Sequence, residues 1–307
     1  MSSDGRPGVS GSPVAYTTGD KLFDSITRPA VLAIALSLSG CANLGAIQEF
    51  GRMSADGASY TKLSDDYVQS PEYRKAFTFR ADTAQRDHLT RVAEERKKQS
   101  AELAIYHRSV SAYMNALADL AGDEAPNFDP ELDAMVDAAA QARYLTEEKA
   151  EAVRALGKAF TGALASTYQQ RELKQVIEHA NAPLQTVIAS MTVIMEGYAE
   201  SLNTEQAVFV SYHQTLIGMG EEKGQDGTMR EPVAAQMAYA NLELGKPAYA
   251  ARARAITRYI ETLQKIGAAH QSLYDHRHRI SDQEVLSQLA RQTRQIRAAY
   301  IAVRAAG

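Results

Sequence analysis

The sequence has 307 residues, a single cysteine and a formal net charge of −4. Its length allows one sizeable hydrophobic core or two small ones. One cysteine excludes a disulfide framework, so stability must come from packing. The net negative charge argues against a nucleic-acid partner.

The first informative segment is residues 28–45, which read RPAVLAIALSLSGCANLG. The run from Pro29 to Gly40 carries no charge, but it is shorter than the roughly 20 residues that a membrane-spanning helix needs. About 7–15 apolar residues are typical of the hydrophobic region of a signal peptide, and Lys21 and Arg28 supply positive charge before it. A buried helix that ends in a structural cysteine is the alternative.

Directly after this run, Leu38-Ser39-Gly40-Cys41 resembles the lipobox of bacterial lipoproteins. The resemblance implies that residues 1–40 are a signal peptide and that cleavage occurs just before Cys41. Cys41 would then carry a diacylglycerol on its sulfur and, as is usual, an acyl group on its new amino group. At about 0.8 kcal/mol per buried methylene, more than one acyl chain makes anchoring stable.

The residue after Cys41 bears on location. In lipoproteins of Gram-negative bacteria an Asp there commonly signals retention in the inner membrane, whereas this chain has Ala42. The resemblance therefore implies a bacterial envelope protein held by lipid at the outer membrane and facing the periplasm. The segment before Lys21 is longer and less basic than is usual before the hydrophobic region of a signal peptide. Translation that starts downstream of Met1 would account for this difference.

The remaining chain is expected to be helical. In residues 41–69, which follow the lipid site, three glycines weaken a helix, and we expect a tether and then a short helix. From residue 70 to residue 307, apolar residues recur every three or four positions, which predicts helices that pack against helices. We expect helices near 72–121, 130–142, 146–180, 183–219, 229–243, 247–278 and 281–305.

The predicted fold class is all-α, an elongated up-and-down bundle with long coiled-coil-like helices. Ser70-Pro71-Glu72 has the pattern of a helix start, and Asn181 and the glycines from Gly220 to Gly227 are typical of breaks. The polar run Glu94–Ser100 either continues a helix or breaks it, and the absence of Gly and Pro favours continuity.

The histidines offer one candidate metal site. His270, Tyr274 and His278 are spaced by four residues, so on a helix they would share a face as metal ligands do. His270 also belongs to an apolar stripe, so a core histidine beside a polar helix end is the alternative. The chain has no HExxH motif, no Glu-x-x-His pair and no GxSxG motif. No cofactor is therefore expected, and the glycine-rich segment Gly218–Gly227 reads as a charged turn.

The C-terminal part is basic. Residues 246–307 contain eleven Lys and Arg residues against four Asp and Glu residues. Arg291, Arg294 and Arg297 could bind anionic lipid headgroups or an acidic partner, since guanidinium groups suit bidentate phosphate contacts. The alternative is that this region packs against the acidic half of the same chain.

Two functions from different classes remain open. The first is a non-enzymatic scaffold or interaction module of the envelope, with a protein partner that the sequence does not identify. The second is a ligand- or metal-binding bundle with a site near His270, Tyr274 and His278. A third, a membrane-shaping or pore-forming protein, would need an exposed apolar face.

Overall fold

The computed structural model describes residues 44–122, 129–142, 145–160 and 169–306, which form an all-α bundle, as the periodicity predicted. Its helices are α2 (Gly45–Ala58), α3 (Lys62–Lys75), α4 (Thr83–Leu120), α5 (Asp129–Gln141), α6 (Glu147–Lys158), α7 (Gln169–Glu221), α8 (Pro232–Asp275) and α9 (Gln283–Ala306), with a 3-10 turn at Arg277–Arg279. Within these ranges, the one strand-like contact is a bridge between Lys223 and Met229 in the turn after α7.

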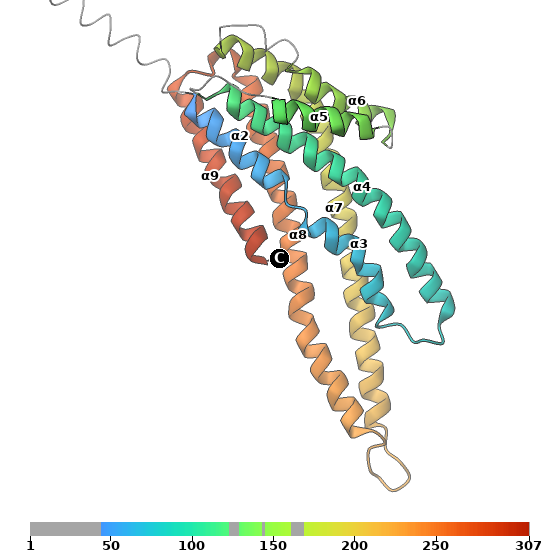
Figure 1. Cartoon of the computed structure of the whole chain (residues 1–307). Coiled ribbons are helices and arrows are strands. Elements are labelled where there is room, and N and C mark those ends of the chain that lie inside the picture. Colours follow the sequence, from blue (N-terminus) through green and yellow to red (C-terminus); the bar gives the residue numbers. More distant parts are fainter. Residues whose placement is uncertain (1–43, 123–128, 143–144, 161–168, 307) are drawn as a thin grey trace, which may run out of the picture. The chain divides into compact units, whose positions relative to one another are not determined.

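Helices α7 and α8 form a long antiparallel hairpin (Figure 1). They have 53 and 44 residues, which correspond to about 80 and 66 Å at a rise of about 1.5 Å per residue. Near the connecting turn, Gly220 of α7 lies against Ala235 of α8. Toward the other end, the Asn181 amide donates to Gln271 at 2.7 Å. The two helices therefore stay together over most of their length.

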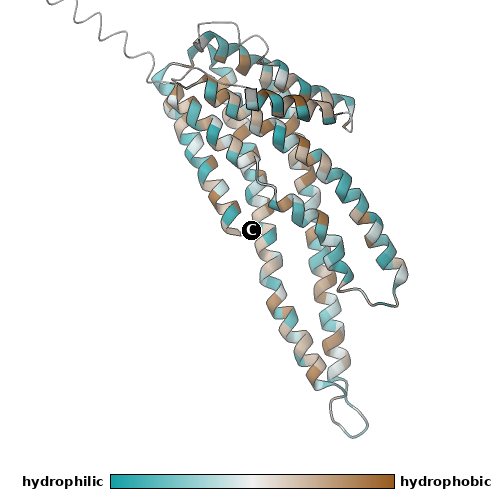
Figure 2. Ribbon diagram, viewed as in Figure 1, coloured by the Kyte–Doolittle hydropathy of each residue, from teal (hydrophilic) through white to brown (hydrophobic). Residues whose placement is uncertain are grey.

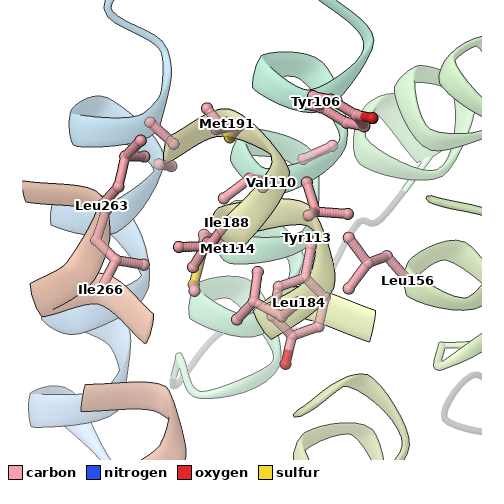
Figure 3. Close-up of a cluster of buried hydrophobic side chains, with 14 of the residues drawn as sticks. Tyr106, Val110, Tyr113, Met114, Leu156, Leu184, Ile188, Met191, Leu263 and Ile266 are labelled. Atoms are coloured by element: carbon pink, nitrogen blue, oxygen red, sulfur yellow. The ribbon is translucent and has the colours of Figure 1, made fainter. Parts of the chain in front are cut away.

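The core lies where α2, α4, α6, α7 and α8 converge, and Figure 3 shows a cluster of its side chains. The helices contribute apolar residues at helical spacing: Tyr106, Val110, Tyr113 and Met114 of α4, Leu156 of α6, Leu184, Ile188 and Met191 of α7, and Leu263 and Ile266 of α8. Most of these residues belong to the stripes that the sequence predicted, because one-sided apolar spacing directs a helix face toward its neighbours.

Helix α2 corrects the expectation of a tether after residue 41. Ile47 and Phe50 are fully buried, and α2 packs against α4 and α9. A Cβ on Gly51 would come within 2.5 Å of the Met114 carbonyl oxygen of α4, and one on Gly57 would touch Thr262 of α8 at 3.1 Å. These glycines permit close helix packing, so the bundle begins near residue 44 and not at residue 70.

Two predicted boundaries at the start of the bundle are also wrong. Pro71 lies inside α3 and does not start a helix there. The next helix, α4, begins only at Thr83. The Asp82 carboxylate caps it by accepting a hydrogen bond from the backbone N–H of Gln85 at 3.0 Å. The polar run Glu94–Ser100 continues α4 as expected, since α4 is one helix of 38 residues.

The predicted breaks within α7 and α8 do not occur. Asn181 and Pro183 lie inside α7, and Pro247 lies inside α8. A proline in a helix interior costs about 3 kcal/mol, and the extensive packing between the two helices offsets that cost. Asn181, a residue typical of breaks, instead uses its side chain for hydrogen bonds to two residues of α8, Gln271 and His270. The break at Gly220–Gly227 is confirmed, because α7 ends at Glu221.

A buried ion pair joins α4 to the middle of the hairpin. Arg96 of α4 and Glu205 of α7 are 4% and 2% exposed, and their N–O distance is 3.2 Å. Arg96 also donates to the Tyr67 carbonyl oxygen and to Ser70 of α3, while Ser70 donates to Glu205 at 2.6 Å. The Arg96 guanidinium lies 4.6 Å from the centre of the Tyr67 ring. Three helices thus share one network whose charges are compensated.

An aromatic cluster holds the hairpin just beyond this ion pair. The ring of Phe209 of α7 contacts those of Phe77 and Tyr249, with centroid distances of 4.9 and 5.2 Å. Gly245 of α8 lies so close to Phe209 that a Cβ there would be 2.2 Å from the ring. Gly245 therefore allows α8 to approach α7 closely at the level where the loop after α3 also contacts α7.

We predict that Glu205→Leu lowers the free energy of unfolding by about 3–5 kcal/mol, because Arg96 would remain buried without its partner. The double variant Arg96→Met/Glu205→Leu should recover most of this loss, since no charge is then buried. Urea unfolding followed by circular dichroism measures both. Glu95→Gln, at an exposed pair with Lys98, is the control and should change little. Equal stability of the wild type and Glu205→Leu would contradict this account of the network.

Candidate interaction surface on helix α8

One face of α8 is covered by other helices in its C-terminal half. Ala255, Tyr259, Thr262 and Ile266 recur every three or four residues on this face and are all buried. Tyr60 follows α2 directly, and its ring contacts those of Tyr259 of α8 and Tyr300 of α9. The distances between ring centroids are 6.3 and 6.4 Å. Helices α2 and α9 therefore cover this half of the face.

The same face continues toward the hairpin turn without a cover. Its residues follow in the same three- and four-residue steps, and we call this set the α8 seam: Val233, Met237, Ala240, Leu244, Ala248 and Ala251. Val233, Met237 and Leu244 are 70%, 63% and 78% exposed, whereas Ala251, nearest the covered half, is half-buried. Figure 2 shows apolar stretches along this outer part of α8.

The length of α9 explains why the α8 seam is exposed. α9 has 24 residues, about 36 Å, which is roughly half the length of α8. It runs antiparallel to α8 from a hydrogen bond between Gln288 and Ser272 at 3.2 Å. Because Tyr300 is level with Tyr259, α9 reaches the level of Ala255 or Ala251 by Ala306. Beyond that level, none of the described helices covers the seam.

The α8 seam has the chemistry of a helix-packing surface. Its six residues span 19 positions of the helix, and none of the six is charged. Val233, Met237, Ala240 and Leu244 follow the alternating four- and three-residue steps of a coiled-coil heptad. Soluble proteins rarely expose contiguous apolar patches of this kind without a binding role. The surface is therefore the best-formed candidate functional site in the described part of the chain.

The predicted metal residues His270 and His278 do not form a shared face. α8 ends at Asp275, so His278 lies in the following 3-10 turn and is exposed. His270 is fully buried in α8, and hydrogen bonds engage both of its ring nitrogens. Among the described residues, no group of three or more His, Cys, Asp or Glu side chains could hold a metal ion.

His270 instead belongs to a chain of hydrogen bonds that crosses three helices. The Tyr113 hydroxyl of α4 donates to Nε2 of His270 at 2.6 Å, and Nδ1–H of His270 donates to Asn181 of α7 at 3.0 Å. Asn181 donates to Gln271, which donates to Asp275 at 2.8 Å. Burial lowers the pKa of His270 to about 3. The neutral ring thus acts as a donor and acceptor within the core.

The predicted anionic-partner residues Arg291, Arg294 and Arg297 lie on α9 and are all exposed. Arg297 forms an ion pair with Glu49 of α2 at 2.9 Å, so it helps to hold α9 against α2. Arg291 and Arg294 have no ion pair with any described residue. Their role toward an acidic partner or anionic lipid stays a prediction.

A second surface feature is a cleft of about 480 Å³ between the α2–α3 turn, α4 and α5. Its polar lining comes from seven residues: Ser59, Thr61, His107, Arg108, Ser111, Asn115 and Glu131. Arg108 is half-buried and makes no hydrogen bond or ion pair within the described ranges. The cleft therefore presents a guanidinium group, hydroxyl groups and the Glu131 carboxylate to any small ligand that enters it.

The predicted lipid site, Cys41, lies outside the described residues, as does the predicted signal peptide at residues 1–40. Of the described helices, none is both long and apolar enough to cross a membrane.

Comparison of the chain with known protein families, with curated proteins and with solved structures gives no significant match. The functional argument therefore depends on the chemistry and geometry of the chain itself.

Stability should fall as the pH is lowered from 7 to 5, because unfolded His270 would take up a proton below its ordinary pKa of about 6.5 while the folded ring stays neutral. His107, whose pKa burial also lowers, acts in the same direction. His270 alone should account for about 2 kcal/mol over this interval. Urea unfolding at both pH values measures the difference.

In His270→Phe that part of the pH dependence should vanish, even if the variant is less stable at pH 7. Tyr113→Phe is the matched control, since it removes a hydrogen bond of the same chain but keeps His270 buried, and its pH dependence should persist. An unchanged pH dependence in His270→Phe would show that His270 is not held neutral.

Proposed function

We propose that this protein is a lipid-anchored component of the bacterial envelope that acts as a non-enzymatic helical interaction module. The anchor would be the lipid on Cys41, and the placement would be the periplasmic side of the outer membrane. One observation supports an anchor at this position: the lipobox-like sequence ends at Cys41.

The observation that carries the interaction role is the α8 seam. Covering it with a helix from another molecule would bury Val233, Met237 and Leu244, each with a gain of about 1.5–3 kcal/mol if burial is complete. A stripe of this kind suits an amphipathic helix, which docks through residues at the same spacing. The buried histidines His107, His213 and His270 support a structural role, since each acts as a hydrogen-bond partner inside the bundle.

We predict that Cys41→Ser moves the protein from the membrane fraction to the soluble or unprocessed fraction, because the acyl chains supply the anchoring energy. Fractionation of cells with an antibody against the protein measures this. Mass spectrometry of the wild-type protein should find residues 1–40 absent and Cys41 acylated. Native protein that retains residues 1–40 and an unmodified Cys41 thiol would contradict the proposed lipid anchor.

Small-ligand binding is a second candidate function, favoured by the unpaired Arg108 in the α4–α5 cleft. A carboxylate or phosphate group would satisfy this guanidinium group. The protein isolated from its cells should then carry a bound small anion, visible in native mass spectrometry as mass above that of the covalent chain. Arg108→Gln should lose this extra mass, whereas Arg294→Gln, an exposed arginine outside the cleft, should keep it. A wild-type mass equal to the covalent mass would reject this function.

A further inference from the structure

We propose that the occupant of the α8 seam is a second copy of the same chain, with the two α8 helices packed antiparallel around a twofold axis near residue 242. The inference depends on the proposed interaction role of the seam and specifies its partner. A twofold interface brings the same patch of both copies together, so the seam must be complementary to itself.

The order of large and small residues along the seam gives this self-complementarity. In an antiparallel pair centred near residue 242, Leu244 of one copy lies level with Ala240 of the other. Met237 then lies level with residues 247 and 248, which are Pro and Ala, and Val233 lies level with Ala251. Each large side chain meets a small one, so the helices can approach closely and interdigitate.

The ends of the seam favour the antiparallel arrangement over the parallel one. Each seam is bounded by α9 at one end and by the α7–α8 turn at the other. In an antiparallel pair, the turn of one copy lies level with the end of α9 of the other, just past the paired stretch from Val233 to Ala251. A parallel pair would instead bring α2 and α9 of both copies side by side and hold the seams apart.

The charges beside the seam are compatible with this pairing. Glu243, the charged residue nearest the twofold axis, forms an ion pair with Lys246 of its own helix at 2.6 Å. Asn241, on the other flank, is exposed and neutral. Closing the seam therefore brings together no uncompensated charge near its centre, which would otherwise oppose association.

A lipid surface suits the seam less well. The hairpin turn and its flanks carry Glu221, Glu222, Asp226 and Glu231 against Lys223 and Arg230. This acidic excess would be repelled by anionic headgroups. The apolar residues, moreover, form a narrow stripe along the helix, which is the shape that another helix fills.

Cysteine crosslinking of the full chain in intact cells tests the proposal. Val233 and Ala251 lie about 27 Å apart on one helix, so a short bis-maleimide cannot join them within one molecule. In the antiparallel pair, position 233 of one copy faces position 251 of the other at the distance of packed helices, about 8–10 Å between axes. The double variant Val233→Cys/Ala251→Cys should give a covalent dimer, while each single variant and the wild type, which has Cys41, should not.

Adding Leu244→Glu to the double variant should lower the yield of dimer at least about tenfold, because closing the seam would then bury two carboxylates. Tyr239→Glu is the matched control: Tyr239 is an exposed apolar residue of the same helix segment that lies off the seam, and its change should leave the yield unaltered. Circular dichroism should show both variants as helical as the wild type.

The other outcomes separate this inference from the proposed function. A dimer from Val233→Cys alone would overturn the antiparallel pairing. If the seam forms crosslinks to a different protein and no dimer, and if Leu244→Glu abolishes those crosslinks, the occupant is not a second copy. The proposed role as an interaction module would then still hold. Binding of the purified protein to anionic vesicles through the seam, again without a dimer, would favour a lipid occupant. No crosslink from the seam to anything would reject both proposals.

Discussion

The proposed interaction role depends on the mismatch in length between α8 and the helices that cover it. A helix of 44 residues lies beside one of 24 residues, so one apolar face is half covered and half exposed. The covered half, which includes Tyr259 and Ile266, serves the core. The exposed half, which includes Met237 and Leu244, has the same spacing and chemistry and serves no described part of the chain. A single continuous stripe thus provides folding energy in one half and, in our proposal, a binding surface in the other.

Packing contacts hold the hairpin that carries this face. The Arg96–Glu205 ion pair and the Phe77–Phe209 contact hold the middle of the hairpin against α3 and α4. Beyond them, α7 and α8 pack against one another, with Gly220 allowing their close approach near the turn. A helix face that is already ordered loses little conformational entropy on binding, so more of the burial energy is available for association. The buried network and the exposed seam therefore act together.

The sequence predicted the all-α class and most of the core, because stripes such as Leu184–Ile188–Met191 have a clear helical period. It failed where tertiary packing overrides local preference. Gly51 and Gly57 favoured a tether, but the structure uses them where helices approach most closely. Asn181 and Pro247 resembled breaks, yet long helices continue through them because the packing on either side outweighs the local cost.

The candidate site was missed for a related reason. Val233, Met237, Ala240 and Leu244 have the heptad spacing of a coiled coil, and this signal was available, but the predicted break before residue 247 concealed its continuity with Ala251. Exposure could not be predicted at all, since it depends on where α9 ends relative to α8. His270 illustrates the opposite case: its place on an apolar stripe indicated burial correctly, and only the structure shows its hydrogen-bond partners.

Amide hydrogen exchange along α8, measured at several protein concentrations, tests most directly whether a second copy covers the α8 seam. If a second copy closes the seam, protection of residues 232–251 should rise with concentration, while residues 255–275, already covered by α2 and α9, should keep the same protection throughout. Fast and concentration-independent exchange in residues 232–251, both in the purified protein and in native membranes, would contradict the account and leave the stripe without a binding role.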